Sequence, residues 1–348
     1  MKEKKSTIAI IALVLVMAAV LYFQITSKPA VQKPGTGKLM PEVPLTEIAL
    51  SGPVADPSAE VSGLAWYGEN LIILPQYPNI LDDKGDGMLY YLPKEEIGLY
   101  LAGARGAPLA PRPIQLIAPD LTDNIRNYQG FESIGFSGDK AFFTIEAGEG
   151  KDMRAYLVSG TINPDLSTLT LDTTKMAEIP TQAKSANHSD ESILILEDRI
   201  LTFYEVNGEK IVSDPVVHVF DFDLNPMGTV PMANLEYRLT DTALMTGNIF
   251  WGINYFYPGD KDLKPKEDPV ADRYGSGETH IKYPQVERLI SFQYTDAGVT
   301  IMSTRPILLS LTEDSRNWEG MVYMEKRGFL VITDKFPTTI LALVPIPR

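Results

Sequence analysis

The feature that most constrains the fold is a hairpin pattern that recurs five times along the chain. In each copy a polar residue precedes a short apolar stretch, a tight polar turn follows, and a second apolar stretch of alternating character runs back. Recurrence of one supersecondary unit is the sequence signature of repeat architectures. The five hairpins are Glu60 to Pro75, Gln129 to Glu146, His188 to Glu205, Arg238 to Asn254 and Arg316 to Asp334.

Further apolar runs follow the hairpins, and we expect them to be the outer strands of the same units. They are rich in Val, Ile, Tyr, Phe and Thr and are bounded by turn residues, as strands are. A third run follows every hairpin, at Met88 to Leu92, Arg154 to Ser159, Val216 to Phe222, Arg288 to Tyr294 and Thr339 to Val344. A fourth follows the first four hairpins, at Pro113 to Ala118, Leu169 to Ile179, Gly228 to Ala233 and Val299 to Leu311.

The last unit lacks a fourth strand, and a matching run lies at the other end, at Leu45 to Leu50. Pairing this run into the last unit would remove the exposed edge of an open array. We therefore predict an all-β fold, a five-bladed β-propeller closed by an N-terminal strand, spanning residues 43–348. The polar, proline-rich insertion from Phe256 to Gln285 is predicted to be disordered, as loops of that length often are.

The N-terminus predicts a membrane anchor. Three lysines precede Ile8 to Phe23, a nearly continuous apolar run that is long enough to cross a bilayer. A cleaved signal peptide is the alternative, but small residues at the A-x-A spacing are missing where the run ends, which favours an uncleaved anchor. We predict a cytoplasmic tail (1–6), a transmembrane helix (7–25) and a tether (26–42). The lysines place the propeller on the extracytoplasmic side, in a periplasm or at the cell surface.

Composition excludes several classes of function. The chain has no cysteine, which rules out disulfides, thiolate metal sites and a cysteine nucleophile. Its 31 basic residues face 45 acidic ones, a net charge of −14 that repels nucleic acid and suits cations.

One aligned position of the hairpins is the main functional clue. The first strand of each propeller unit lines the central axis, so the same position from every unit converges there. Gathered carboxylates must take up protons or share a cation, and a set of oxygen ligands favours Ca²⁺. The alternative is that each acid binds backbone N–H groups of its own turn. This ring consists of Ser62, Glu132, Glu191, Asp241 and Glu319.

Three residues before the ring, the hairpins carry His188, Arg238 and Arg316. Arginine binds phosphate or carboxylate through a bidentate fork, so these side chains could hold a small anionic substrate. The alternative is that they pair with nearby carboxylates. At the ends of the second strands, Glu146, Glu205 and Asp334 are candidates for a general base toward a metal-bound water.

Several hairpins resemble a known family. The segments SGLAWYGENLIIL, FESIGFSGDKAFF, DESILILEDRILTF and NWEGMVYMEKRGFLVITD resemble phytase-like (esterase-like) β-propellers, and the order of the ring residues is similar to the central calcium ring of calcium-activated nucleotidases (apyrases). The resemblance implies that the ring residues are calcium ligands. Asp241 departs from the pattern, since apyrases place a serine there, and the turn LPQYP lacks their acidic and arginine residues, so the nucleotide contacts do not carry over.

Together these observations predict a membrane-tethered propeller with a central Ca²⁺ that hydrolyses a phosphoester or related anionic ester. The alternative is a non-catalytic binding or assembly module, in which the cation is structural and the loops hold a protein partner.

Overall fold

The computed structural model describes residues 38–81 and 85–347, and the predicted hairpins are its central elements. In each, two antiparallel strands are joined by a tight turn. The pairs are β3 (Val61–Tyr67) with β4 (Asn70–Pro75), β7 (Tyr128–Ser137) with β8 (Lys140–Glu149), β11 (Asp190–Ile195) with β12 (Ile200–Tyr204), β15 (Arg238–Thr246) with β16 (Ile249–Phe256), and β20 (Trp318–Met324) with β21 (Gly328–Thr333).

Further strands extend each hairpin outward, close to the predicted positions. The third strands are β5 (Met88–Pro93), β9 (Asp152–Ile162), β13 (Val216–Phe220), β17 (Val286–Thr295) and β22 (Leu341–Pro345). The fourth strands are β6 (Arg112–Ile117), β10 (Thr168–Ile179) and β14 (Pro226–Pro231), whereas the fourth position of the next unit is divided between β18 (Gly298–Ile301) and β19 (Ile307–Leu309).

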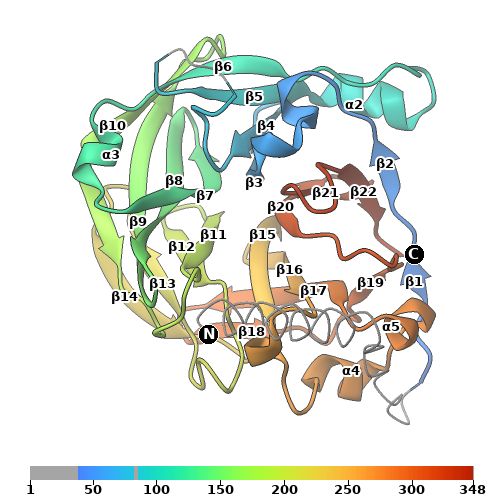
Figure 1. Cartoon of the computed structure of the whole chain (residues 1–348). Coiled ribbons are helices and arrows are strands. Elements are labelled where there is room, and N and C mark those ends of the chain that lie inside the picture. The colour runs from blue at the N-terminus through green and yellow to red at the C-terminus, as the bar shows by residue number, and fades with distance from the viewer. Residues whose placement is uncertain (1–37, 82–84, 348) are drawn as a thin grey trace, which may run out of the picture.

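The first strands of the hairpins surround the centre of the molecule (Figure 1). β3 lies against β7, β7 against β11, β11 against β15, β15 against β20, and β20 against β3, which completes a ring. Apolar side chains such as Phe131, Phe143 and Trp318 fill the spaces between neighbouring sheets. The predicted all-β propeller is confirmed.

The N-terminal segment joins two sheets of this ring. β2 (Thr46–Ile48) pairs antiparallel with β22 and completes the last sheet, as predicted. β1 (Glu42–Val43) pairs parallel with β19 of the preceding sheet, and its first residue, Glu42, lies at the end of the predicted tether.

One connection was not predicted. β6 and β10, the outer strands of the first two units, pair with each other in parallel. This joins β3 through β10 into one eight-stranded sheet, and nothing in the repeated pattern indicates that these outer edges meet.

The prediction of disorder for the insertion after β16 is wrong. The segment forms η3 (Lys261–Leu263), α4 (Pro269–Tyr274) and α5 (Glu278–Lys282). Asp268 accepts hydrogen bonds from the amides of Val270 and Ala271 at the start of α4, and its carboxylate also binds both terminal nitrogens of Arg288 at 2.9 and 3.0 Å. A buried bidentate ion pair and a helix cap hold the insertion against β17.

The insertion also holds the start of the described chain. The amide of Met40 donates to the carbonyl of Ser276 at 3.0 Å, and Glu42 Oε1 accepts hydrogen bonds from Thr279 N and His280 Nδ1, both at 2.9 Å. A side chain at Gly277 would meet Glu42 Oε1 at 2.0 Å, so the fit here depends on glycine.

Short helices complete the structure outside the ring: η1 (Pro53–Ala55), η2 (Pro57–Ala59), α2 (Lys94–Leu101) and α3 (Leu121–Asn124). None of the helices within 38–81 and 85–347 has the length and apolar character to cross a bilayer. The predicted tail, anchor and most of the tether, residues 1–37, lie outside the described residues.

Candidate functional site

The ring positions of the sequence are positions of backbone irregularity in the structure. In each first strand the pairing with the second strand is interrupted by a β-bulge, and the ring residue lies in that bulge. A bulge leaves its extra residue unpaired and re-aims the side chain, which is why bulges are frequent beside active sites. The bulged residues are Ser62 in β3, Glu132 in β7, Glu191 in β11, Thr240 and Asp241 in β15, and Glu319 in β20.

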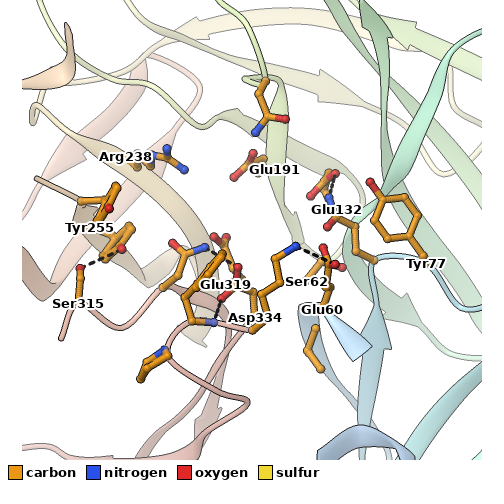
Figure 2. Close-up of a pocket in the computed structure, with 18 of the residues that line it drawn as sticks. Glu60, Ser62, Tyr77, Glu132, Glu191, Arg238, Tyr255, Ser315, Glu319 and Asp334 are labelled. Atoms are coloured by element: carbon orange, nitrogen blue, oxygen red, sulfur yellow. Dashed lines mark hydrogen bonds and ion pairs between the residues drawn. The ribbon is translucent and has the colours of Figure 1, made fainter. Parts of the chain in front are cut away.

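Four of these five bulges contribute their residue to the lining of a cavity of about 620 Å³. Glu132, Glu191 and Glu319 point into it from different strands, with Ser62 beside them (Figure 2). Four of the five predicted ring residues are therefore brought together. The rest of the lining is mixed in character and comprises Glu60, Val61, Gln76, Tyr77, Asn187, Arg238, Tyr255, Tyr257, Asp314, Ser315, Asn317, Asp334, Lys335, Phe336 and Pro337.

The three ring glutamates have few partners for their charge. Glu132 Oε1 accepts a hydrogen bond of 3.1 Å from Gln76 Nε2, and no described residue donates one to Glu191. Burial raises the pKa of the Glu132 carboxyl well above its usual value, and the charge of Glu146 raises it further. Burial likewise raises the pKa of Glu191, with Glu205 as the next cause, and that of Glu319, with Asp334 next.

Asp241 is the ring residue that the structure separates from the others. Its bulge contains two residues rather than one, and it does not line the cavity. Asp241 Oδ2 accepts a hydrogen bond of 2.6 Å from the amide of Met321, and Oδ1 accepts one of 2.8 Å from the amide of Thr242. Asp241 therefore joins β15 to β20 through backbone N–H groups, the alternative that the sequence left open for all the acids.

Of the two arginines expected to bind an anion, Arg316 lies away from the cavity and is fully engaged. Its Nη2 lies 2.7 Å from Glu287 Oε2, its Nε donates to the same oxygen at 2.9 Å, and its amide donates to Glu287 Oε1 at 3.0 Å. Trp318 Nε1 also donates to Glu287 Oε2, at 2.8 Å. Arg316 thus compensates a buried carboxylate from β17, and we withdraw the substrate-binding role predicted for it.

Arg238 does line the cavity, but two carboxylates hold it. Its Nη1 donates to Glu205 Oε1 and its Nη2 donates to Asp260 Oδ2, each at 2.7 Å. Among the described residues that line the cavity, only Arg238 and Lys335 carry a positive charge. Lys335 Nζ lies 2.7 Å from Glu60 Oε1 at the mouth, and its side chain is 36% exposed, so it is the more available of the two.

His188, the third residue expected to bind substrate, lies beside the cavity rather than in its lining. Its Nδ1 is 2.6 Å from Ser185 Oγ, and its Nε2 is 3.8 Å from Glu205 Oε2. The neighbouring Asn187 does line the cavity.

The three candidate bases occupy different environments. Asp334 lines the cavity; burial raises the pKa of its carboxyl, and it accepts hydrogen bonds from Asn317 Nδ2 and the amide of Phe336. Glu146 lies behind the lining, and burial, followed by the charge of Glu205, raises its pKa to about 7. Oε2 of Glu146 and Oε2 of Glu205 are buried with no hydrogen-bond partner in the described part of the chain.

The donor set at the cavity floor fits a hard cation in its chemistry. It offers only carboxylate and hydroxyl oxygens, which Ca²⁺ prefers. Within the described residues, however, no three acidic or histidine side chains are positioned to share a metal ion. Ligation would therefore require the glutamates to move closer together.

The opening of the cavity is lined by aromatic side chains that the sequence did not predict. Tyr257 and Phe336 are 50% and 57% exposed, and Tyr77 and Tyr255 lie deeper. Tyr257 lies just after β16 and Phe336 just after β21, beyond the hairpins, where no repeated pattern marks them. Their connection to the site could have been inferred only from the rule that loops at one end of a propeller lie together.

Comparison with known proteins adds little to this geometry. No protein-family model and no curated protein matches the sequence. Solved structures with a similar fold include a putative glycoside hydrolase from Parabacteroides distasonis (10% identity, 93% of this chain and 95% of that one, TM-score 0.47). Others are an α-L-arabinofuranosidase from Lactobacillus brevis (13%, 86% and 93%, 0.43) and a glucose dehydrogenase (12%, 87% and 99%, 0.42). Similarity this weak carries no argument about activity.

Proposed function

We propose that this chain is a membrane-tethered, extracytoplasmic, five-bladed propeller that binds Ca²⁺ at its centre and hydrolyses a phosphoester or related anionic ester in the cavity above. The observation that carries the proposal is the set of three buried glutamates, Glu132, Glu191 and Glu319, which face one cavity from separate strands. The closed cycle of first strands supports five blades, and the apolar run at Ile8 to Phe23 supports the tether.

A cation is the simplest compensation for this charge. Like charges that share a site raise one another's pKa, so without a cation the cluster must be partly protonated. Ser62, Glu132, Glu191 and Glu319 would hold Ca²⁺ through oxygen atoms, as the resemblance to apyrases also implies. When bound, the ion would supply a Lewis acid and lower the pKa of a water molecule.

The residues around the ring would supply the general base and the contact with the anionic group of the substrate. Asp334 reaches the cavity and is our first candidate for the general base, because a base must come within hydrogen-bond distance of the water that it activates. Glu146 has the more suitable pKa, about 7, but lies behind the lining. Lys335 would bind the anionic group of the substrate by exchanging its ion pair with Glu60.

The proposal is tested first by the melting temperature of the full-length chain with Ca²⁺ and with chelator. A ligand that binds only the folded state stabilises it by about 2.7 kcal/mol at a concentration of 100 times its Kd. We expect Ca²⁺ to raise the melting temperature of the wild type and not of the Glu132→Gln, Glu319→Gln double variant. Asp314→Asn is the matched control, since Asp314 is an exposed acid that lines the same cavity, and its response should equal that of the wild type. Equal responses of all three proteins would refute the calcium site.

Activity is tested next with a panel of phosphoesters, assayed with and without Ca²⁺. Glycosides belong in the same panel, because paired carboxyl groups also perform glycoside hydrolysis.

A binding module remains the second candidate. The observation that favours it is the engagement of Arg238 by two carboxylates, which leaves one available cation for an anionic substrate. Calcium-dependent melting without turnover of any ester or glycoside would favour this reading.

A further inference from the structure

A serine, a histidine and a glutamate form a chain of polar contacts beside the cavity, and neither the proposed cation site nor its substrate uses it. Ser185 Oγ lies 2.6 Å from His188 Nδ1, and His188 Nε2 lies 3.8 Å from Glu205 Oε2. A hydroxyl within hydrogen-bond distance of a base, with the base facing an acid on its other side, is the arrangement by which weak nucleophiles are activated.

The acid at the end of this chain is held in place. Glu205 is fully buried, its amide donates to the carbonyl of Ser189, and its carbonyl accepts a hydrogen bond of 2.7 Å from the amide of Leu239. Arg238 Nη1 binds Oε1 of its carboxylate at 2.7 Å. Only Oε2 has no hydrogen-bond partner in the described chain, and this is the oxygen that faces His188.

The separation of 3.8 Å between the histidine and the glutamate is slightly too long for a hydrogen bond. Such contacts are often long in enzymes without substrate and shorten when it binds. Since the backbone of Glu205 is fixed by β15 and by Ser189, a small rotation of the His188 ring would close the gap.

One residue of the loop that carries the serine and the histidine lines the cavity. Asn187, between them, has a φ of 57°, in the left-handed region, which asparagine adopts more readily than most other residues. Asn187 lines the cavity, and its side-chain amide donates to no other described residue, so it is available to a ligand.

We propose that Ser185, His188 and Glu205 form a nucleophilic site for carboxylic esters, with Asn187 as hydrogen-bond donor to the carbonyl oxygen. Ser185 Oγ would add to the carbonyl carbon while His188 Nδ1 takes the hydroxyl proton. The bond from that carbon to the alcohol oxygen then breaks, and the alcohol leaves with the proton from His188. Water adds to the acyl-serine in the same way, releasing the carboxylic acid and restoring the serine.

The three residues use the imidazole in the reverse sense to the familiar serine hydrolases, in which Nε2 faces the serine. The chemistry requires only that one nitrogen accept a proton while the other is held by an acid. Neither step involves the cation, which makes this site separable from the proposed function.

The test is covalent labelling of the full-length chain with a fluorophosphonate, together with hydrolysis of p-nitrophenyl acetate. Both are run in chelator, at a temperature where the melting curve shows the protein folded. We expect one adduct, on the peptide that contains Ser185, and ester hydrolysis that persists without Ca²⁺. Ser185→Ala should abolish the adduct, and His188→Asn should slow hydrolysis by about 100-fold or more, the contribution of a positioned base.

Ser315→Ala is the matched control, because Ser315 lines the cavity beside which Ser185 lies, but its hydroxyl contacts Tyr255 OH at 3.0 Å and no histidine. It should label and turn over ester as the wild type does. If Ser185→Ala, with an unchanged melting temperature, hydrolyses the ester at the rate of the wild type, or if the adduct lies on another residue, the proposal is wrong. Ser185 is small and only half-buried, so this variant decides the question even if His188→Asn does not fold.

Discussion

Two groups of buried acids in this propeller differ in the hydrogen-bond donors that surround them. Glu287, at the junction of the last two sheets, accepts hydrogen bonds from the amide and guanidinium of Arg316 and from Trp318 Nε1. Glu191 and Glu319, at the centre, have no comparable set of donors. Burial therefore raises the pKa of the central carboxyls.

The difference shows which acids are structural. A buried carboxylate is stable when donors satisfy its oxygens, and it is costly when they do not. Donors satisfy both oxygens of Glu287, which joins two sheets, whereas no described residue donates a hydrogen bond to Glu191 in the cavity and Glu132 has one donor, Gln76. That pattern favours a ligand as the missing partner of the central acids.

The largest effect should come from breaking the structural pair. Arg316→Met leaves Glu287 charged and buried without its cation, and we expect a loss of about 3 to 5 kcal/mol of unfolding free energy. Chemical denaturation of the full-length chain measures it. Arg199→Met is the control, because Arg199 pairs with exposed acids and should cost under about 1 kcal/mol. Equal losses would remove the distinction between the two groups.

The next largest effect should be the change of unfolding free energy with pH. The pKa of Glu146 is raised from 4.5 to about 7 in the folded state, so the folded protein binds more protons than the unfolded chain between these values. In chelator, stability should therefore be fully present below about pH 4.5 and fall as the pH rises through 7, by on the order of 3 kcal/mol. Calcium should flatten this slope, measured by denaturation at several pH values. A stability that rises over this range in chelator would contradict the raised pKa.

Removing the charges of the central glutamates should have a smaller effect, and it should raise the unfolding free energy. In chelator, Glu132→Gln with Glu319→Gln removes charges that repel each other, and we expect the unfolding free energy to rise by about 1 to 3 kcal/mol. Destabilisation in chelator would show that these acids are structural, as Glu287 is.

The smallest change in stability should come from a substitution at the mouth of the cavity. Lys335→Met removes a partly exposed ion pair with Glu60, at a cost of about 0 to 1 kcal/mol. Lys326→Met, at the exposed pair with Glu325, is the control for stability. If Lys335 binds the anionic group of the substrate, its variant should raise the KM for phosphoesters while leaving the calcium-dependent shift in melting temperature unchanged.

The sequence alone predicted the hairpins, their outer strands and the closing strand, because alternating apolar residues and turn residues are local signals. It also predicted that Glu132, Glu191 and Glu319 face one cavity, since equivalent positions of a closed ring converge. It could not place Asp241, because nothing in the local pattern shows that the bulge of β15 contains two residues.

The sequence also could not predict which charged side chains pair with one another. Arg316 was expected at the cavity, yet its partner, Glu287, lies on β17, in a different unit. The insertion after β16 is likewise held by Arg288 of the next strand, β17, which binds Asp268. Pairings of this kind depend on tertiary distance, and a single sequence gives no measure of it.

The attachment of the N-terminal segment determines which proteolytic cuts the propeller would tolerate. Leu39 to Val43 contact the insertion and β19, and Thr46–Ile48 complete the last sheet. A protease that cut before Lys38 would leave both of these strands paired and the ring of sheets closed. A cut after Ile48 would instead remove a strand from each of two sheets and expose their edges. The closure of the ring therefore depends on which end of this short segment a protease reaches.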